Sequence, residues 1–527
     1  MIFKKNIHFV KLSFIYSFLI AVLFNYTVFS KLNFYFANSP SHTLFESFFL
    51  LLVFLVLWSL LFIIFLILGM RYFLRPLIGF VLIMSSIIFY YKKTYGISVD
   101  EGIIVSGIDA FKEGNFNEIR DLFHYKIIAY IILMGIVPSI PLLFIRVKYP
   151  SLIKELITRV ASIVLIILGL FALIFVNYKD VSITARVVKK LNQETIPHYS
   201  ISSMINLVKH SFRKNIKFTV LDSKPSTEID KPILGIVVVG ETARADHFGL
   251  NGYHRNTTPL LEKQNITNYT NAKSCGTLTK VSVPCMFYLG DYDNYSERKA
   301  RFQTNALDIA SSAGVEVLWV ENNSSCKNVC ERIKKTIVVT DQNDTYDELL
   351  LEHTVKFINN LKNKNGLIVL HAMGSHGPKY FKRYPKQFEK FLPSCKSNAP
   401  QDCSREELIN AYDNTILYTD FIVNSLIEIL KKDNLNSFLI YASDHGESLG
   451  EKGLYLHGVP MRFAPKEQTH IPFLLWYSDS YKENNKIFLK NKNENITHEH
   501  FSHTILKSLK VKSTALKEEK SLLRLNQ

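Results

Sequence analysis

Three side chains that can bind a metal ion follow two apolar runs of the sequence. Glu241 comes two residues after the run Ile233–Val239, and Asp444 and His445 come just after the run Phe438–Ala442. A short apolar run that ends in such residues is typical of a buried strand with polar side chains at its carboxyl end. Carboxylate and imidazole groups suit a borderline divalent ion such as zinc.

Two further histidines could join this site. His376 follows a third apolar run, Leu367–His371, and His457 lies twelve residues after His445. Taken alone, a Glu after a strand is usually a helix cap or a surface residue, and a lone His is usually hydrogen-bonded. In an open α/β sheet, however, the carboxyl ends of the strands form one edge where sites lie. Because three strand ends supply such residues together, a metal site is the favoured interpretation.

The segment SCGTLTKVSVPCMF could supply a nucleophile to such a metal. A hydroxyl is a poor nucleophile at its ordinary pKa, and coordination to a metal activates it. A loop closed by a disulfide would hold that hydroxyl rigidly. The residues alone do not choose among Thr277, Thr279 and Ser282, and a polar turn that caps a helix is the alternative.

The six cysteines all lie after residue 270, in three couples that are close in sequence. An even number grouped in this way indicates disulfides in an oxidising compartment. The alternative is a metal site, since two of the cysteines are spaced like half of a zinc site, but no second close pair has a matching spacing. The couples are Cys275 and Cys285, Cys326 and Cys330, and Cys395 and Cys403.

The elements that precede this part of the chain are membrane spans. Five apolar stretches are long enough to cross a bilayer, which takes about 20 residues. The first exceeds a usual signal-peptide core and no small-x-small cleavage site follows it, so we expect an uncleaved anchor. The stretches are Val10 to Ser30, Ser47 to Leu68, Leu74 to Tyr91, Ile127 to Ile145 and Leu156 to Val176.

Basic residues predict the orientation of these spans. They gather before the first, between the second and third, and between the fourth and fifth, at Lys4, Lys5, Lys11, Arg71, Arg75, Arg146, Lys148 and Lys154. Basic residues in the loop 92–126 weaken the pattern. With five spans and a cytoplasmic N-terminus, residues 177–527 are periplasmic, which agrees with the cysteine pattern.

The net charge of +16 suits a protein that works beside anionic lipid headgroups. A bias toward lysine on solvated faces explains the same charge equally well. The charge therefore decides little about function.

After residue 231, apolar runs alternate with helical patterns. Further to the runs named above, Val315–Val320 reads as a strand, and Thr304–Ala313, Tyr346–Leu361 and Glu406–Lys431 read as helices. This alternation predicts an α/β domain with a largely parallel sheet and helices on both faces. We expect a transmembrane domain over residues 1–176, a connector over 177–230 and a catalytic domain over 231–527.

The connector contains apolar residues at helical spacing. Ile201, Met204, Ile205 and Val208 repeat with Phe212, and Lys209, His210, Arg213 and Lys214 lie nearby. The pattern predicts an amphipathic helix, either on the membrane surface or packed against the globular domain.

Six ordered motifs give the sequence a specific resemblance to a known family. It resembles the membrane-bound phosphoethanolamine transferases that modify lipid A, including the mobile colistin-resistance enzymes, within the alkaline phosphatase and sulfatase superfamily. The motifs cover most of residues 233–465: VVGETARADHFGLNGY, SCGTLTKVSVPCMF, WVENNSSCKNVC, LHAMGSHGPKYFKRYP, AYDNTILYTDFIV and YASDHGESLGEKGLYLHG. The five-span first half fits the same family.

The resemblance implies a role for each candidate residue. Thr279 would be the nucleophile, and His376 and His457 would lie beside the metal for substrate or a second zinc. Arg301 matches a basic residue that contacts substrate in relatives. The resemblance also implies the three disulfides within the cysteine couples, and one zinc ion held by Glu241, Thr279, Asp444 and His445.

One departure concerns the periplasmic loop YGISVDEGIIVSGIDAFKEGNFNEIRDLF. Lipid A modifiers often carry an Asn, a Thr and a Glu there that help to bind ethanolamine. Ser106 and Ala110 occupy the expected Asn and Thr places, and Glu118 matches the Glu only with inserted residues. The donor contacts in this loop and the acceptor are therefore open.

The reaction implied is a two-step phosphoryl transfer. Thr279 attacks the phosphorus of phosphatidylethanolamine and expels diacylglycerol, and an acceptor glycolipid such as lipid A then attacks the phosphoethanolamine-threonine intermediate. His376 or His457 could protonate the leaving oxygen. The family implies a multi-pass protein of the bacterial inner membrane with a role in polymyxin resistance, and we expect a monomer with no nucleic-acid partner.

Three other functions are alternatives to phosphoethanolamine transfer. A phosphoglycerol transferase of the lipoteichoic-acid-synthase kind shares the scaffold and a Thr nucleophile, but the three cysteine couples and the CGT context argue against it. A sulfatase would need the motif C/S-x-P-x-R, which is missing around Cys285. A catalytically inactive membrane lipid-binding protein would usually have lost ligands, and here all of them are present.

Overall fold

The chain folds into two compact units in the computed structural model. The helical unit comprises Met1–Ile104 and Phe123–Arg213, and the α/β unit comprises Val105–Leu122 and Lys214–Gln527. We keep the three-part division made from the sequence as a proposal. The structure describes residues 5–37, 44–112, 124–176, 193–211, 217–227, 231–323, 325–339, 346–361, 363–397, 400–432 and 434–525.

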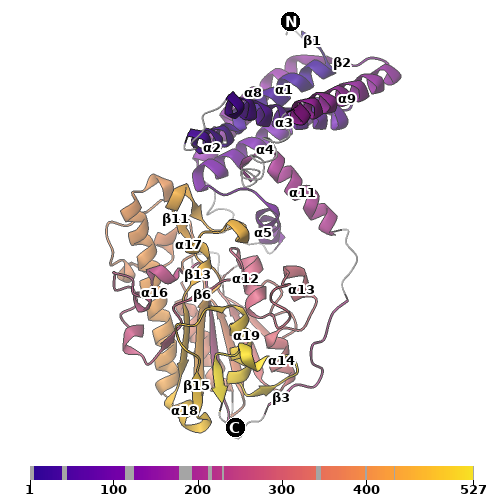
Figure 1. Ribbon diagram of the computed structural model, residues 1–527. Coiled ribbons are helices and arrows are strands. Elements are labelled where there is room, and N and C mark those ends of the chain that lie inside the picture. Colours follow the sequence, from indigo (N-terminus) through magenta and orange to yellow (C-terminus); the bar gives the residue numbers. More distant parts are fainter. Residues whose placement is uncertain are drawn as a thin grey trace. The chain divides into compact units, whose positions relative to one another are not determined.

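Within the part of the chain that the structure describes, the helical unit contains four helices, or runs of consecutive helical segments, that are long and apolar enough to cross a membrane. They are Phe48–Leu68 within α3 (Leu44–Leu68), α4 (Leu74–Tyr95), Leu152–Phe175 within α9 (Leu152–Val176), and the run Lys126–Phe144 formed by α7 (Lys126–Tyr130), the π-helix η1 (Ile131–Ile136) and α8 (Val137–Phe144). The pair formed by α1 (Phe9–Phe24) and α2 (Tyr26–Ala37) makes a fifth span if it is counted as one. By length and composition, the expected spans are therefore present (Figure 1).

The first expected span is bent rather than continuous. The helices α1 and α2 meet at an angle of 56° around Asn25, which is fully buried. The Asn25 side chain donates to the Ile196 carbonyl at 2.8 Å and accepts from the Ile196 amide at 2.9 Å. A side chain that bonds to backbone in this way competes with regular helix, which explains the break.

Charged side chains attach α9 to its neighbours within the helical unit. Glu155 pairs with Arg159 at 2.8 Å and with Arg71 at 3.2 Å, and Arg159 also donates to the Gly69 carbonyl at 2.8 Å. None of the apolar window of α9 is buried, as expected for a helix that faces lipid. Its attachment therefore combines these polar contacts at one end with packing of the partly buried Ile163 and Ile166 against the core of the unit.

The predicted amphipathic helix is α11 (His198–Ser211). Its apolar residues Met204, Ile205 and Val208 are nearly half exposed, at 45–48%. Such exposed apolar side chains on one helix suit a membrane surface. Phe212, Arg213 and Lys214 lie outside the described residues.

A seven-stranded sheet forms the centre of the α/β unit (Figure 1). Its order is β5-β14-β10-β4-β9-β7-β8, with β10, β4, β9, β7 and β8 parallel and β14 antiparallel at one side. The four predicted strands are confirmed, each within one residue at either end. The strands are β4 (Leu234–Gly240), β7 (Glu316–Glu321), β9 (Gly366–His371), β10 (Ser437–Ser443), β8 (Lys335–Val338), β14 (Phe473–Tyr477) and β5 (Thr267–Asn268).

Helices cover both faces of this sheet, as predicted. Alternate residues of β4 point to opposite faces, so that Val237 and Val239 join one core and Ile236 and Val238 join the other. The first core includes residues of α12 (Thr279–Met286), α14 (Ala306–Ser312) and α19 (Glu499–Ser508), and the second includes residues of α15 (Glu348–Asn360) and α16 (Arg405–Lys432).

The parallel strands end level with one another. Val239 of β4 is opposite Ala442 of β10 and His371 of β9, and His371 is opposite Glu321 of β7. The polar residues that follow these strands consequently start from the same edge of the sheet. This register is what brings the candidate site residues together.

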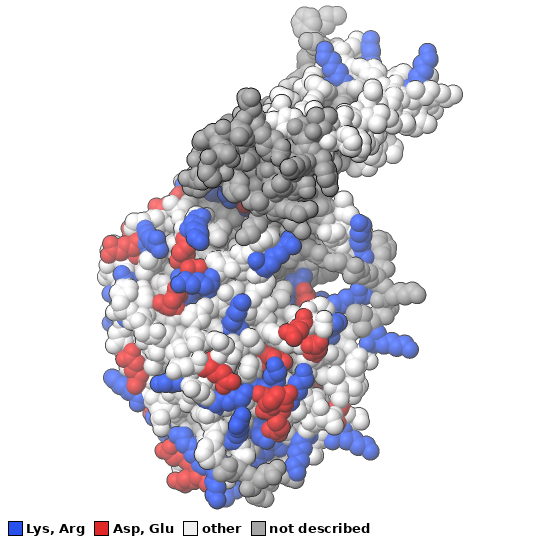
Figure 2. Space-filling view, viewed as in Figure 1, with Lys and Arg blue, Asp and Glu red and all other residues white. Residues whose placement is uncertain are grey.

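The visible surface of the α/β unit carries both signs of charge. Figure 2 shows blue and red side chains interspersed over this unit rather than one continuous basic patch. The described part of the helical unit in the same view is mostly uncharged, as a lipid-facing surface requires. On this face the arrangement favours the solvated-lysine explanation of the net charge.

Candidate active site and metal centre

Glu241, Asp444 and His445 meet at the carboxyl edge of the sheet. Glu241 follows β4, and the other two residues follow the adjacent parallel strand β10. All three are fully buried. His445 Nε2 lies 3.5 Å from Glu241 Oε1 and 3.3 Å from Asp444 Oδ2, and one ligand atom from each residue lies within 4.8 Å of the others.

The tautomer of His445 directs a lone pair toward the two carboxylates. Its Nδ1 lies 3.0 Å from the Gly446 carbonyl, which can only accept, so Nδ1 carries the hydrogen. In the neutral ring, Nε2 is then an acceptor facing two other acceptors. Among the residues that the structure describes, no other group of three such side chains converges in this way.

The electrostatics of this group fit a divalent cation. Burial, with the neighbouring Asp444 carboxylate, holds the pKa of Glu241 well above its usual range, and burial raises the pKa of Asp444. Burial, followed by the nearby His457, lowers the pKa of His445 well below its usual range. Each residue on its own therefore resists charging, whereas a divalent cation among them would favour two carboxylates and a neutral imidazole.

A surrounding set of donors orients the two carboxylates. Asn323 Nδ2 donates to Glu241 Oε2 at 2.9 Å, and Ser282 Oγ donates to Asp444 Oδ2 at 3.1 Å. The backbone amides of Thr242 and His445 donate to Asp444 Oδ1 at 3.2 and 2.7 Å. Such outer contacts hold metal ligands in place.

Asn323 was missed by the sequence reasoning. It lies two residues beyond β7, in the WVENN segment. The signal was present, because β7 is a fourth parallel strand that ends at the same edge. The polar residues considered from the sequence follow β4, β9 and β10, and the end of β7 was not among them.

The segment 274–287, here called the nucleophile loop, carries the three candidate hydroxyls. The structure gives each of them different partners. Thr279 Oγ1 lies 3.2 and 3.3 Å from the Glu241 carboxylate oxygens and 3.4 Å from His445 Nε2. Thr277 Oγ1 instead donates to the Val459 carbonyl at 2.7 Å. Thr279 is thus the hydroxyl that shares a site with the convergent acceptors.

Ser282, the third hydroxyl, lies one turn further along α12. Its Oγ contacts Asp444 and also lies 2.9 Å from the Leu278 carbonyl. Thr279 is the first residue of this helix, where the helix dipole favours negative charge. Position at the helix terminus therefore favours an ionised oxygen on Thr279 over one on Ser282.

A glycine allows the β9 loop to approach Glu241. Gly374 has φ +51°, and a Cβ atom there would lie 2.8 Å from the Glu241 carbonyl oxygen. The next amide, of Ser375, donates to that carbonyl at 3.0 Å. A side chain at position 374 would push this loop, with His376, away from the site.

His376 and His457 lie beside the convergent group. The His457 ring centre is 4.5 Å from that of His445 and 5.3 Å from that of His376. Burial, with His457 next to it, lowers the pKa of His376. The buried Glu447 contacts His457 Nδ1 at 3.3 Å and accepts from the Gly377 amide at 3.3 Å, so it connects the segments that carry both histidines.

Glu447 was also missed by the sequence reasoning, although it lies three residues after Asp444 in the same motif.

Arg301 lies at the end of α13 (Glu297–Arg301), where it pairs with Glu297 at 2.6 Å. Lys280, next to Thr279, lies 3.7 Å from the same carboxylate. Arg301 is thus linked through Glu297 to α12, the helix that begins at Thr279.

The predicted contacts to the phosphatidylethanolamine donor in the loop 95–123 involve side chains outside the described residues. Glu118 lies outside the described residues. Ser106 and Ala110 belong to α5 (Glu101–Lys112), but their side chains are likewise outside them. A role for these positions stays a proposal.

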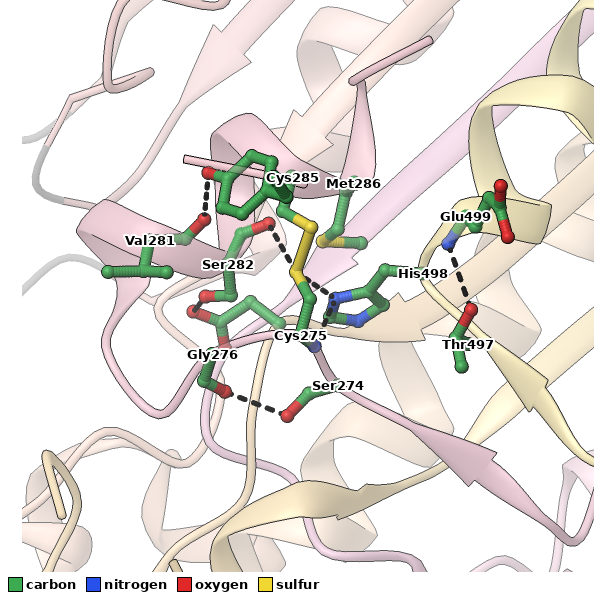
Figure 3. Close-up of a disulfide and its surroundings, with 12 residues drawn as sticks. Ser274, Cys275, Gly276, Val281, Ser282, Cys285, Met286, Thr497, His498 and Glu499 are labelled. Atoms are coloured by element: carbon green, nitrogen blue, oxygen red, sulfur yellow. Dashed lines mark hydrogen bonds between the residues drawn. A yellow bond between two sulfur atoms is a disulfide. The ribbon is translucent and has the colours of Figure 1, made fainter. Parts of the chain in front are cut away.

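The structure forms the three expected disulfides, and no cysteine is free. They join Cys275 to Cys285, Cys326 to Cys330, and Cys395 to Cys403. The first closes the loop that carries Thr279 (Figure 3).

Known families match both halves of the chain. A family model described as sulfatase matches residues 234–511. A second, described as phosphoethanolamine transferase EptA/EptB, matches residues 57–212. The two matches correspond to the sheet-containing part and to most of the membrane helices.

Individual proteins match most of the chain. It is 37% identical over 424 residues to the phosphoethanolamine transferase EptA of Escherichia coli strain K12, covering 78% of this chain and 77% of that one. It is 36% identical over 480 residues to the phosphatidylethanolamine transferase Mcr-1 of Escherichia coli, covering 86% and 87%.

A solved structure covers nearly the whole length. The integral membrane protein lipooligosaccharide phosphoethanolamine transferase A of Neisseria meningitidis matches with a TM-score of 0.90 and 31% identity, over 98% of this chain and 99% of that chain. Both halves of the chain therefore have counterparts in one membrane protein.

Proposed function

Because the chain belongs to the family of phosphoethanolamine transferases that includes EptA and Mcr-1, we propose that it moves phosphoethanolamine from phosphatidylethanolamine to lipid A or another envelope glycan. Two relatives support both substrates, since Mcr-1 is named a phosphatidylethanolamine transferase and the Neisseria protein a lipooligosaccharide phosphoethanolamine transferase. The proposed location is the bacterial inner membrane, with the α/β unit in the periplasm.

One observation carries the proposal: the Thr279 hydroxyl lies within 3.2–3.4 Å of Glu241 and His445 at the start of a helix. A hydroxyl beside convergent metal ligands is the arrangement that a covalent phosphoryl transfer needs. Thr277, two residues earlier, is engaged with Val459. We therefore assign the nucleophile to Thr279.

We assign zinc to the group formed by Glu241, Asp444, His445 and Thr279. Two carboxylates, one imidazole with its other nitrogen hydrogen-bonded, and one hydroxyl suit a borderline divalent ion. When bound, zinc would lower the pKa of the attacking hydroxyl and neutralise charge on the phosphoryl oxygens.

The chain's own residues then carry out two displacements. Thr279 Oγ attacks the phosphorus of phosphatidylethanolamine, and the phosphorus–oxygen bond to diacylglycerol breaks. The histidine pair takes up the proton that Thr279 Oγ loses on attack, and His376 or His457 delivers a proton to the departing oxygen. In the second displacement, a phosphate or hydroxyl of the glycan attacks the same phosphorus, and the Thr279 oxygen leaves and regains a proton.

The test is the covalent intermediate. Full-length protein in detergent is incubated with phosphatidylethanolamine alone, and peptides containing residues 274–287 are analysed by mass spectrometry. We expect a phosphoethanolamine group on Thr279, and addition of lipid A should remove it and yield modified lipid A. An unmodified Thr279, or a modified Thr277 or Ser282, would contradict the assignment.

The same measurement addresses the alternatives. A phosphoglycerol transferase would leave a phosphoglycerol group, which has a different mass. An inactive lipid-binding protein would leave no adduct. Neither alternative is favoured, because the family match covers both halves of the chain.

A further inference from the structure

A buried histidine outside the proposed metal ligands joins the two segments that carry Thr279 and Asp444. His498, directly before α19, is fully buried. Its Nε2 lies 2.9 Å from the carbonyl of Ser443, and its Nδ1 lies 3.4 Å from the amide nitrogen of Cys275. Ser443 directly precedes Asp444, and Cys275 lies four residues before Thr279.

The two contacts fix the tautomer of His498. The Ser443 carbonyl can only accept, so Nε2 carries the hydrogen, and the Cys275 amide can only donate, so Nδ1 accepts. Burial lowers the pKa of His498 to about 4, and the ring is neutral at neutral pH. A neutral imidazole has one donor and one acceptor, and here both are used between two backbones.

The imidazole also contacts the disulfide that closes the nucleophile loop. His498 Nδ1 lies 3.4 Å from Cys275 Sγ (Figure 3). On the other side of the loop, Ser282 donates to Asp444 Oδ2 at 3.1 Å. The loop is thus attached to the end of β10 at two points, once through Ser282 and once through His498.

The helix behind His498 is firmly held. Phe501, Ile505 and Leu506 of α19 are fully buried in the same core as β4 and β10, and Ser502 Oγ donates to the Met286 carbonyl of α12 at 2.5 Å. A ring mounted on such a helix can act as a spacer of fixed length.

We propose that His498 is a positioning residue for phosphoryl transfer. It holds the disulfide-closed loop at a set distance from the end of β10, and so keeps the Thr279 hydroxyl in register with Asp444 and His445. The role rests on the proposed function, since this register matters for catalysis only if Thr279 attacks a substrate.

Two substitutions of His498 each keep one of the two backbone contacts of the ring and remove the other. His498→Asn places an amide oxygen near the Nδ1 position and keeps the bond to Cys275, whereas His498→Gln places an amide nitrogen near Nε2 and keeps the bond to Ser443. We expect each to lower kcat by roughly 10- to 100-fold, the range for a small displacement of a reacting group. KM for phosphatidylethanolamine should change by less than about twofold, because ground-state binding is untouched.

His503→Asn is the matched control. His503 lies on the same helix and is also fully buried, and its Nδ1 accepts from the Lys517 amide at 3.2 Å, away from the loop and from β10. This substitution should lower the thermal midpoint as His498→Asn does, while kcat of the folded enzyme stays within about twofold. Equal losses of kcat in the His498 and His503 variants would overturn the positioning role.

A second measurement does not depend on activity. Because His498 Nδ1 contacts Cys275 Sγ, His498→Gln, which loses this contact, should let a thiol reductant open the Cys275–Cys285 bond several-fold faster than in the wild type, whereas His498→Asn, which keeps a polar atom near the Nδ1 position, should have a smaller effect. Reduction of Cys326–Cys330 in the same samples should be unchanged, as should both bonds in His503→Asn. An unchanged rate at Cys275–Cys285 would overturn the inference.

The two readouts separate this inference from the proposed function. A folded wild-type protein that transfers no phosphoethanolamine would overturn the proposed function. The reduction rates would then still decide whether His498 holds the loop to β10.

Discussion

Asp413 and Asp444 are both fully buried carboxylates of the α/β unit, but different atoms surround them. Asp413 accepts from three side chains: His247 Nδ1 at 2.6 Å, Tyr253 at 3.0 Å and Arg255 at 2.9 Å. Asp444 also accepts three hydrogen bonds, from the amides of Thr242 and His445 and from Ser282, but these donors are neutral, and its Oδ2 also faces His445 Nε2, with Glu241 in the same group.

Burial alone does not show whether a carboxylate is structural or binds a metal; the charge of its partners does. The guanidinium of Arg255 compensates the charge of Asp413, so its network needs nothing further to be stable. At Asp444 the acceptors face one another, and a bound cation would supply the missing positive charge. Two equally buried aspartates therefore mark a structural cluster and a candidate metal centre.

The largest expected effect belongs to the metal-centre side of this comparison. Thr279→Ala should reduce transfer by more than about 10³-fold, because it removes the nucleophile. Because Glu241, Asp444 and His445 remain, zinc content should fall far less than in Asp444→Asn, and the thermal midpoint should change little. Product formation by mass spectrometry measures this, with Thr277→Ala as the matched control that keeps most activity. High activity in Thr279→Ala would exclude it as the nucleophile.

Asp444→Asn should reduce metal affinity by more than about 100-fold, since loss of a ligand exceeds the loss of an outer contact. In chelator-treated protein, the same substitution should leave the thermal midpoint equal or higher, because it removes one of two crowded carboxylates. Metal analysis and thermal unfolding test both parts. Full metal occupancy in the variant would make Asp444 structural and end the contrast with Asp413.

Asp413→Asn should show the opposite behaviour. Removing the charge leaves Arg255 and His247 with a weaker partner, and we expect a loss of about 3 kcal/mol in unfolding free energy, the lower end for a broken buried pair because Arg255 is a quarter exposed. Metal content per folded molecule should be unchanged. Denaturant unfolding with metal analysis measures this, and a parallel fall in metal content would show that the two clusters are coupled.

Each of the two clusters has an asparagine that contacts one of its charged side chains, and the two asparagines can be compared in the same way. Asn323→Ala removes the donor to Glu241 and should lower metal affinity by roughly 10- to 100-fold. Asn410, which accepts from Arg255 at 2.6 Å, is the counterpart on the Asp413 side, and Asn410→Ala should affect only stability. Titration with zinc after chelator treatment separates the two. Equal affinities in both variants would remove Asn323 from the metal centre.

The smallest effect is expected at a disulfide outside the nucleophile loop. Replacing Cys326 and Cys330 by Ser should cost about 2 kcal/mol of stability, as the chain-entropy model gives for so short a loop. Activity of the folded protein should persist, whereas the same change at Cys275 and Cys285 should also lower kcat, because that bond frames Thr279. Peptide mapping under nonreducing conditions checks the starting state, and free thiols there would contradict a periplasmic location.

Much of the fold could be predicted because it is encoded locally. The strands β4, β7, β9 and β10 are continuous apolar runs, as buried parallel strands must be, and their predicted ends were within one residue. The membrane helices follow from the length of apolar sequence that a bilayer requires. The ligands Glu241, Asp444 and His445 were found because each follows such a run.

The sequence reasoning left out β14 and α19. The run Phe473–Tyr477 is as apolar as the predicted strands, but it pairs antiparallel with β10 and no candidate ligand follows it. The helix α19 has mixed polar and apolar residues, and eight of its ten residues are buried by tertiary packing. Neither element carried a chemical signal that pointed to the site.

What the sequence determined by itself is which residue types lie at which strand ends, because burial leaves a pattern in neighbouring residues. Only the tertiary structure decided among chemically equal groups. Thr277, Thr279 and Ser282 differ in the partners that folding brings to them, and Val459 lies 182 residues from Thr277 in the chain. Likewise Ile196, which docks on the Asn25 side chain at the bend after α1, lies 171 residues away. The physical reason is that a hydrogen bond depends on positions in space, and distant segments reach those positions only when the sheet and its helices have packed.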